Sequence, residues 1–411
     1  MSVLRNVSEN IHLSHHKPVY IGKRRKSIGR QNNPPYANKR YNTSMSLEMQ
    51  SSAGAVTIIG GHTYDYFCGC GYLGLQGHPR VNAAAVEAIE HYGLSTATSR
   101  GGYGEHPLYR ALEEEACAFF NCERLLHFAS GYMGASILVQ SSLNAHDHFF
   151  IDKSAHFSLW DAAALSNCPI TPFKHLDPDA LAAGLRTELH PGEHPILLSD
   201  GLFPISGEIA PLAEYLALLQ PLHGRMIVDD AHAAGVLGKH GRGTLEHFGI
   251  NDAACQTTAT FNKALGGFGG FICGSKKTLD RIEQNSRILI GSSPPPLPAV
   301  AASVAALCLL RETPELLTDL RANIRMARKG LNELGWTLPE SPSPILCLPG
   351  RAGVNLLQLR DGLFKRGIAV EFVTNYPSTP AGGALRVAIF ASHSAAQINH
   401  LLEEMKTLLS V

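Results

Sequence analysis

The amino-acid sequence predicts an α/β fold: a large, mostly parallel sheet with helices on both faces, followed by a smaller α+β domain. From about residue 79 to 290, short apolar runs alternate with helical patterns, the order typical of layered α/β domains with right-handed crossovers. These runs are apolar on both faces, as strands are in a covered parallel sheet. Four prolines between residues 294 and 298 mark a junction, and the patterns beyond it predict the second domain.

Each element is expected from its periodicity. In the first domain the expected helices lie at 79–92, 107–120, 133–143, 178–187 and 212–222. The expected strands there lie at 124–128, 148–151, 196–199, 225–228, 257–260 and 270–273. In the second domain, helices are expected at 299–311, 314–334 and 395–409, and strands at 345–348, 368–372 and 385–389.

The predicted organisation has three parts: an N-terminal arm over residues 1–45, a large domain over 46–295 and a C-terminal domain over 296–411. The arm contains a basic run from Lys23 to Lys26, and Glu9 is its only acidic residue. It lacks the apolar core of a secretory signal. A mobile or partner-bound arm is the favoured interpretation, and a transit peptide is the alternative.

The composition excludes several classes of function. Lys+Arg and Asp+Glu both number 35, so the formal net charge is zero and nothing indicates a nucleic-acid partner. No apolar run approaches the ~20 residues that span a bilayer. Cys68 and Cys70 form a pair, but no second pair follows at zinc spacing, so no metal is expected. The other cysteines are scattered in apolar segments, as in proteins of the reducing cytoplasm.

Ligands of open α/β sheets bind at the carboxyl ends of the strands, so polar residues that end apolar runs are candidate site residues. Asp229 ends one such run, and His232 follows three residues later. A buried carboxylate needs a cationic partner, and a protonated pyridine nitrogen is one. The alternative is a strand-end aspartate that caps the next turn.

A second segment places Lys263 between a predicted strand that ends at Thr260 and a cluster of glycines. Glycines let the backbone approach a ligand closely, and a partly desolvated lysine becomes nucleophilic. The Thr260 hydroxyl is a candidate phosphate ligand. The lysine precedes the glycines, so the segment is not a GxxxxGKS phosphate loop, and an exposed loop lysine is the alternative.

A third segment, Ser130-Gly131-Tyr132-Met133, lies between a predicted strand and a helix start. Free amides at a helix N-terminus attract anions, although an ordinary strand–helix turn has the same pattern. His156 lies in a further polar segment, and a histidine taken alone is more often structural than catalytic.

Taken in order, these motifs resemble the α-oxoamine synthases, the class-II pyridoxal-phosphate-dependent acyltransferases of fold type I. The likeness rests on Ser-Gly-Tyr, Ala-His-x-Ser-Leu, Val-Asp-Asp-Ala-His and Thr-x-x-Lys-Ala-Leu-Gly, and it covers about residues 65 to 410. The last two motifs, some thirty residues apart, are the most specific.

The resemblance implies a role for each matched position. Lys263 is the implied Schiff-base lysine, Asp229 the partner of the pyridine nitrogen, His232 the contact of the phenolic oxygen and His156 the residue stacked on the ring. The phosphate is expected to bind at the amides of Tyr132 and Met133, at Thr260, and at Ser292 of a neighbouring subunit, which implies a homodimer. The expected substrate-binding residues are Arg386, for the amino-acid carboxylate, and Asp200, near the cofactor.

Two positions depart from the family pattern. Gly71 stands where the family has Asn, and Pro204 stands where it has Ser. In the family both lost side chains lie near the cofactor and the substrate carboxylate. We therefore expect a different amino-donor pocket, in which Ser206 is one candidate replacement.

The favoured function is the condensation of an α-amino acid with an acyl-CoA thioester, with decarboxylation, to give an aminoketone and free CoA. An aminotransferase or a decarboxylating lyase, using the same Lys263, Asp229 and Arg386, is the second hypothesis. A binding or regulatory relative without catalysis is the third, and the presence of Lys263, Asp229, His232 and His156 argues against it.

Overall fold

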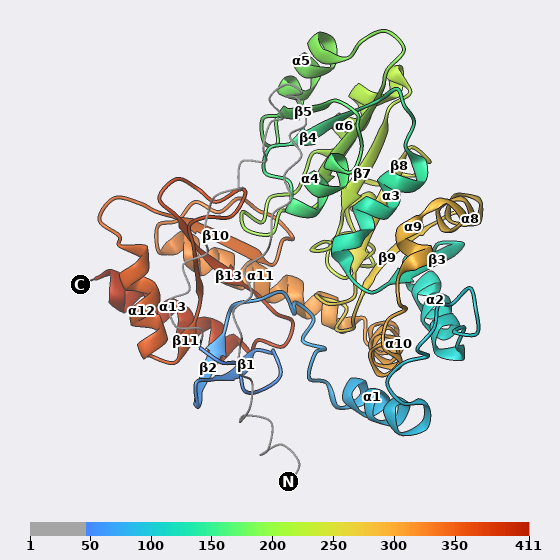
Figure 1. Cartoon of the computed structure of the whole chain (residues 1–411). Helices are drawn as coiled ribbons and strands as arrows, with labels where there is room; N and C mark the ends of the chain where they lie inside the picture. Colours follow the sequence, from blue (N-terminus) through green and yellow to red (C-terminus); the bar gives the residue numbers. More distant parts are fainter. Residues whose placement is uncertain (1–46, 411) are drawn as a thin grey trace, which may run out of the picture. The chain divides into compact units, whose positions relative to one another are not determined.

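The computed structural model describes residues 47–410, so the expectation for the N-terminal arm lies outside the described residues. Those residues belong to one compact unit. Figure 1 shows a large sheet with its helices and, next to it, the C-terminal strands and helices.

The large sheet has seven strands in the order β3-β9-β8-β7-β6-β4-β5. Only β9 is antiparallel to its neighbours. The predicted fold class, a mostly parallel sheet, is thereby confirmed. The strands are β3 (Arg124–Phe128), β4 (Asp147–Asp152), β5 (Ile170–Phe173), β6 (His194–Asp200), β7 (Arg225–Asp229), β8 (Cys255–Thr260) and β9 (Gly270–Gly274).

Helices cover both faces of this sheet, and alternation along the strands shows which face each helix covers. Phe149 and Ile151 of β4 pack with α3 (Gly134–Ser142), α4 (Phe157–Ala164) and α8 (Lys276–Asn285). Phe150, between them, packs on the opposite face with α5 (Pro178–Glu188) and α6 (Leu212–Leu219). Because both faces are buried, most of these strands are mainly apolar, which is the pattern that predicted them.

The remaining helices of the large-sheet region lie beyond its edge or link its strands. α1 (Pro79–Tyr92) and α2 (Pro107–Phe120) pack against α10 (Leu297–Glu312). The first two match their predicted bounds. The short elements are η1 (Gly131–Met133), η2 (Gln220–Leu222), α7 (Thr244–Phe248) and α9 (Arg287–Gly291).

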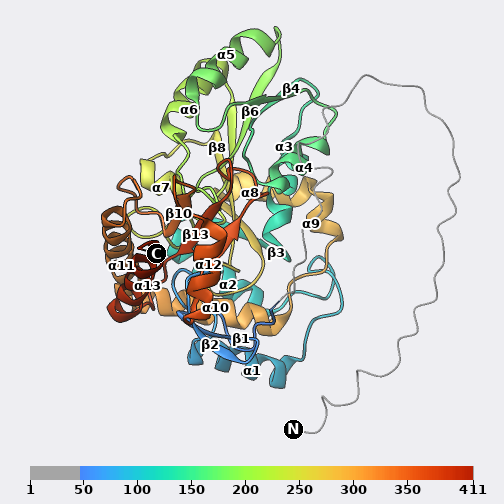
Figure 2. The ribbon, with the colours of Figure 1, turned by 90° about the vertical axis from the view of Figure 1, so that its left-hand side faces the viewer.

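Two three-stranded sheets complete the described structure. One is antiparallel, in the order β10-β13-β12, with β10 at Ile345–Pro349, β13 at Ala384–Ala388 and β12 at Glu371–Val373. In the other, the hairpin of β1 (Val56–Ile59) and β2 (His62–Tyr66) pairs with β11 (Ile368–Ala369). The helices around them are α11 (Glu315–Glu333), α12 (Leu356–Lys365) and α13 (Ala395–Leu409), and Figure 2 shows α11 beside α13.

One predicted element is wrong in this region. The strand expected at 368–372 is two strands, β11 and β12, which belong to different sheets. The apolar run continues through Val370 between them, and its periodicity carries no sign of the change of partner. Which sheet a short segment joins depends on residues far away in sequence.

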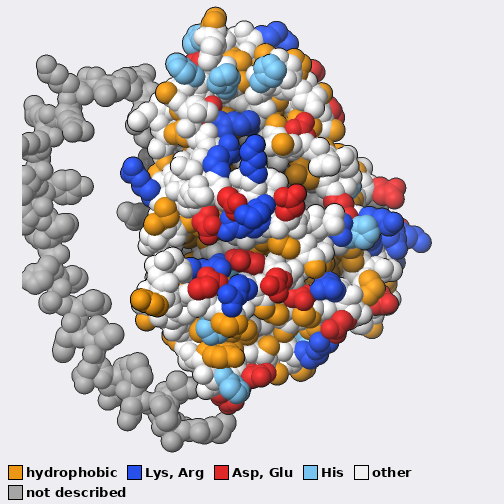
Figure 3. Space-filling model, turned by 90° about the vertical axis from the view of Figure 1, so that its right-hand side faces the viewer, with side chains coloured by type: hydrophobic (Ala, Val, Ile, Leu, Met, Phe, Trp, Pro, Cys, Tyr) orange, Lys and Arg blue, Asp and Glu red, His pale blue; other side chains and the backbone are white. Residues whose placement is uncertain are grey.

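The helices of the described residues bear on a membrane span, and one face of their surface (Figure 3) bears on a charged patch of one sign. Within residues 47–410, none of the helices combines the length and the apolar character needed to cross a bilayer. On the face shown in Figure 3, Lys and Arg side chains are interspersed with Asp and Glu. That mixture agrees with the zero formal net charge.

A buried charge pair at the end of β4 makes the stability of the fold depend on pH. The ring nitrogen Nδ1 of His175 lies 2.9 Å from Asp152, whose side chain is fully buried. Burial lowers the pKa of His175, but the bonds to Asp152 and Glu208 outweigh it and raise the pKa to about 9. The histidine takes up its proton more readily in the folded state than in the unfolded state. It therefore stabilises the fold, and this stabilisation is fully present below the unfolded pKa of about 6.5.

We expect up to about 3 kcal/mol of folding free energy to be lost as pH rises from about 6.5 through 9. Urea unfolding at pH 6 and pH 9.5 measures this loss in the wild type. His175→Gln should flatten the dependence, whereas His62→Gln, an exposed position on β2, should not. Equal pH dependence in all three proteins would contradict the prediction.

Candidate active site

The carboxyl ends of the parallel strands bring the predicted polar residues to one edge of the large sheet. Asp200 ends β6 and Asp229 ends β7, and the two residues are register partners. Thr260 ends β8, the next strand along the sheet. β3 runs in the same direction as β8, because both are antiparallel to β9, so the turn after Phe128 meets the same edge.

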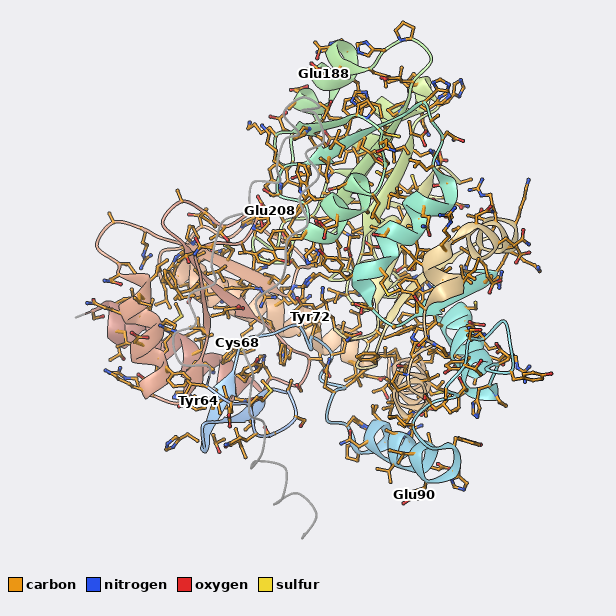
Figure 4. All side chains as sticks on the ribbon, viewed as in Figure 1. Tyr64, Cys68, Tyr72, Glu90, Glu188 and Glu208 are labelled. Carbon is orange, nitrogen blue, oxygen red and sulfur yellow. The ribbon has the colours of Figure 1, made fainter. Side chains whose placement is uncertain are left out.

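A cavity of about 1040 Å³ lies at this edge, between the large sheet and the C-terminal strands. It is lined by four residues singled out in the sequence: His156, His232, Lys263 and Arg386. The first three come from loops of the large sheet and the fourth from β13. The segment between β2 and α1, on which Figure 4 labels Cys68 and Tyr72, also contributes to the wall.

Asp229 is buried, with 7% of its surface exposed. Its carboxylate accepts hydrogen bonds from the Ser158 hydroxyl at 3.4 Å and from the Ala231 amide at 2.9 Å. Within residues 47–410, no Lys, Arg or His forms an ion pair with it. A buried carboxylate with only these two donors fits a site that receives a cation from outside the chain.

Asp200 lies beside Asp229 but behind the cavity wall, where its Oδ2 accepts the His156 amide at 2.8 Å. Burial and the neighbouring charge of Asp229 raise the pKa of Asp200 well above its usual range. Asp200 therefore holds its proton more readily than a free carboxyl does.

His156 caps the N-terminus of α4, and its Nδ1 lies 2.8 Å from the Ser158 hydroxyl. Burial lowers the pKa of His156, so the ring is neutral near pH 7. Its ring centroid lies 5.9 Å from that of Tyr132, which follows β3. A neutral aromatic ring exposed to the cavity is suited to lie against another planar ring.

A chain of hydrogen bonds links His232 to Arg386 through Tyr72. The Arg386 Nη2 donates to the Tyr72 hydroxyl at 3.2 Å, and that hydroxyl lies 2.7 Å from Nδ1 of His232. Since the tyrosine oxygen accepts from arginine, its proton is available for Nδ1, and the His232 proton is then on Nε2. Burial holds the pKa of His232 well below its usual range, so His232 is a neutral donor facing the cavity.

Lys263 lies in the turn after β8, between the exposed Asn262 and the buried Ala264 and Leu265. The Gln76 Nε2 donates to the Lys263 carbonyl at 2.5 Å, which fixes the backbone while the side chain reaches the cavity. Lys263 lines the same cavity as the rings of His156 and His232.

The turn after β3 packs against the end of β8. A Cβ at Gly131 would lie 2.9 Å from Cβ of Thr260, so only glycine permits this approach.

The predicted phosphate contacts lie at this turn. The Tyr132 amide donates a long hydrogen bond of 3.3 Å to Ser130 Oγ, and the Met133 amide donates to the Ser130 carbonyl at 3.0 Å. The Thr260 hydroxyl donates to the Gly269 carbonyl at 2.9 Å. The three predicted phosphate contacts are thus neighbours, each with a local partner.

Ser292 lies in a different place from the other predicted residues. It lines a second cavity, of about 500 Å³, together with Arg100, Gly101 and Gly102, and its hydroxyl donates to the Ile288 carbonyl. The Lys263 cavity of the same chain does not include it.

Arg386 is 2% exposed, and each nitrogen of its guanidinium has an acceptor. Nε donates to the Pro204 carbonyl at 2.7 Å, and Nη1 donates to the Gly69 carbonyl at 3.0 Å and reaches Glu371 at 3.4 Å. Nη2 contacts Tyr72 and the Cys70 sulfur. The arginine is therefore fixed in place, and a ligand carboxylate must replace some of these acceptors.

The two departures from the family pattern have visible consequences. A Cβ at Gly71 would lie 2.7 Å from Oε1 of Gln76, so the missing side chain makes room for the residue that binds the Lys263 carbonyl. Pro204 lines the cavity and offers only its carbonyl to Arg386. Ser206 accepts the Glu208 amide at 3.3 Å and is not part of the cavity wall, so it does not replace the lost serine.

Gly71→Asn is expected to push Gln76 away from Lys263 and to lower the affinity for the cofactor about tenfold, the effect of one lost hydrogen bond of about 1.4 kcal/mol. Equilibrium dialysis against pyridoxal phosphate measures this loss. Gln76→Ala removes the same bond without crowding and should reproduce it. If Gln76→Ala leaves the affinity unchanged, the loss in Gly71→Asn has another cause.

Sequence reasoning missed several residues of this site, namely Tyr72, Gln76, Ser158 and Glu371. Tyr72 and Ser158 lie inside motifs that were noted for other positions, so a signal existed for these two. Gln76 and Glu371 reach the site only through the fold, and nothing in their local sequence marks them.

The described part of the chain contains no cluster of three or more His, Cys, Asp or Glu side chains arranged to hold a metal. The donors around the cavity instead suit an organic cofactor with an aldehyde, a basic ring nitrogen and an anionic group. The protein groups in question are one amine, one carboxylate without an ion-pair partner in the described chain, two neutral imidazoles and the start of a helix.

The comparisons with known proteins agree with this donor set. Residues 68–405 match the family model described as "Aminotransferase class I and II". An 8-amino-7-oxononanoate synthase from Methylococcus capsulatus is 36% identical over 85% of this chain and 90% of its own length. A solved structure of serine palmitoyltransferase with pyridoxal phosphate has a TM-score of 0.82 at 25% identity, over 89% of this chain and 93% of its own.

The chain belongs to the class I and II aminotransferase family. Within that family it is a pyridoxal-phosphate-dependent acyltransferase of the α-oxoamine synthase group, as the resemblance of its motifs implied. The predicted cofactor is thereby confirmed.

Proposed function

We propose that the cavity around Lys263 is where this enzyme condenses an α-amino acid with an acyl-CoA thioester, with loss of the carboxylate as CO₂, to give an aminoketone and free CoA. The observation that carries the assignment to this cavity is the buried carboxylate of Asp229, which has no cationic partner in the described chain and lies at the same sheet edge as Lys263. The names of the most similar relatives support the reaction type.

The residues present fit pyridoxal phosphate. We assign Lys263 to its aldehyde carbon, Asp229 to its ring nitrogen, His232 to its phenolic oxygen and His156 to its ring face. Tyr132 and Met133, with Thr260, are assigned to its phosphate, and Asp200 positions His156 through the backbone amide. When bound, this cofactor withdraws electrons from the α-carbon of an amino acid and so makes the α-proton acidic.

The chain's own residues then bind, orient and move protons. Arg386 binds the amino-acid carboxylate through its planar guanidinium group. This orients the bond between the α-carbon and the carboxylate, which breaks when CO₂ leaves. The Lys263 amine, once free, takes the α-proton and returns it at the end of the reaction. Tyr72 keeps the proton of His232 on Nε2, where it faces the cavity. Alignment of this kind is worth several orders of magnitude in rate.

We also propose that the enzyme is a homodimer in which Ser292 of one subunit reaches the phosphate held by the other. The place of Ser292 on a separate cavity, away from Lys263 of its own chain, supports this arrangement. Cytoplasmic location is our expectation as well. All nine cysteines are free thiols, which suits a reducing compartment.

The release of free thiol tests the reaction. The purified holoenzyme is incubated with a panel of amino acids, each with and without an acyl-CoA, and CoA is detected with a thiol reagent. Thiol release that requires both substrates, together with an aminoketone found by mass spectrometry, is the expected result. Keto acid or amine formed without any thiol would instead indicate an aminotransferase or a lyase.

A further inference from the structure

Glu371 lies directly opposite Arg386 in the small antiparallel sheet. The two residues are register partners on β12 and β13, so their side chains lie on one face. Oε2 of Glu371 is 3.4 Å from Nη1 of Arg386, and within residues 47–410 no other carboxylate forms an ion pair with this arginine. The Glu371 side chain is 49% exposed and lines the same cavity as Lys263.

This pair conflicts with the binding of an amino acid. If Arg386 binds the substrate carboxylate, which rests on the function proposed above, two carboxylates share one guanidinium. Like charges at such short distances repel each other, and the repulsion is stronger in a partly buried site than in water. Two further residues of this wall, Arg360 and Asp361, pair with each other at 2.6 Å.

We propose that Glu371 determines which amino acid the site accepts, by favouring a hydroxyl on the β-carbon and disfavouring a second carboxylate. The β-substituent of an amino acid bound through its carboxylate lies next to that carboxylate, and so next to Glu371. A hydroxyl donates a hydrogen bond to Glu371 once the substrate occupies Arg386. A methyl group leaves Glu371 without this donor, and a second carboxylate adds repulsion.

Serine and alanine form a matched pair of probes, since they differ by one hydroxyl, and aspartate adds a carboxylate. Each is titrated into the holoenzyme without acyl-CoA, and its dissociation constant is read from the change in cofactor absorbance. The proteins are the wild type, Glu371→Gln and, as a matched control, Asp361→Asn, which removes a charge from the same wall without touching Arg386.

The wild type should bind serine about tenfold more tightly than alanine, the value of one hydrogen bond to a charged group. In Glu371→Gln, alanine should bind more tightly than in the wild type and the penalty on aspartate should shrink. The serine preference should fall from about tenfold to about threefold, because the glutamine carbonyl still accepts a hydrogen bond but carries no charge. Asp361→Asn should retain the wild-type preferences.

Two outcomes would overturn the proposal. One is a serine-to-alanine ratio that is the same in Glu371→Gln as in the wild type, which would leave Glu371 as a counter-ion of Arg386 only. The other is a wild type that prefers alanine or aspartate. A failure of the proposed reaction would be seen in the thiol-release assay, as no free CoA with any acyl-CoA. The serine-to-alanine binding ratios could still be measured in that case.

Discussion

Replacing Lys263 with Ala should abolish the covalent retention of pyridoxal phosphate and lower turnover by about 10⁴-fold, since both the attachment point and the base are lost. Borohydride reduction followed by mass spectrometry under denaturing conditions detects the covalent cofactor. The wild-type chain should gain the mass of the reduced cofactor, and the Lys263→Ala chain should not.

The fold should tolerate this change. Lys263 lies at the cavity wall, while Ala264 and Leu265, which anchor the turn, stay in place. Lys276→Ala is the matched control, because this lysine is exposed on α8 and its one ion pair within residues 47–410 is with Asp280. A Lys263→Ala protein that still carries covalent cofactor would show that another lysine holds it, and the site assignment would fail.

Asp229→Asn should lower turnover by about 10²- to 10³-fold, the range seen when one charge-stabilising group is removed from an active site. Asparagine keeps the shape of the side chain, and its carbonyl oxygen can still accept one of the bonds that Asp229 receives from Ser158 and Ala231. What is lost is the negative charge that would hold a proton on the ring nitrogen. The cofactor spectrum should therefore change as well as the rate.

Asp200→Asn distinguishes charge from shape at the same sheet edge. Burial and the neighbouring Asp229 raise the pKa of Asp200 well above its usual range, so this carboxyl carries a negative charge less readily than a free carboxyl does. Its replacement should cost much less than the loss of Asp229, and it should act through the position of His156. Equal losses in the two variants would contradict the assignment of Asp229 to the ring nitrogen.

Most strands and helices of the large sheet were predicted, because burial on both faces makes a strand mainly apolar, but the edge strand β5 was missed. β3, α1 and α2 match their expected bounds, and the strand ends at Asp229 and Thr260 lie where the apolar runs predicted. α8 was missed because its polar, charged sequence lacks the apolar density of the other helices, and α4 and α12 were missed as well. The antiparallel direction of β9 was not foreseen either, because strand direction has no local signal.

Local patterns and ordered motifs determined the fold class and the cofactor and singled out the residues proposed to act on it, because each depends on a few residues close together in the chain. Only the tertiary structure decided what surrounds them. It placed Tyr72 between His232 and Arg386, Gln76 against Lys263, and Glu371 opposite Arg386. These contacts join residues as much as 314 positions apart, and their existence depends on how separate elements pack rather than on any neighbouring sequence.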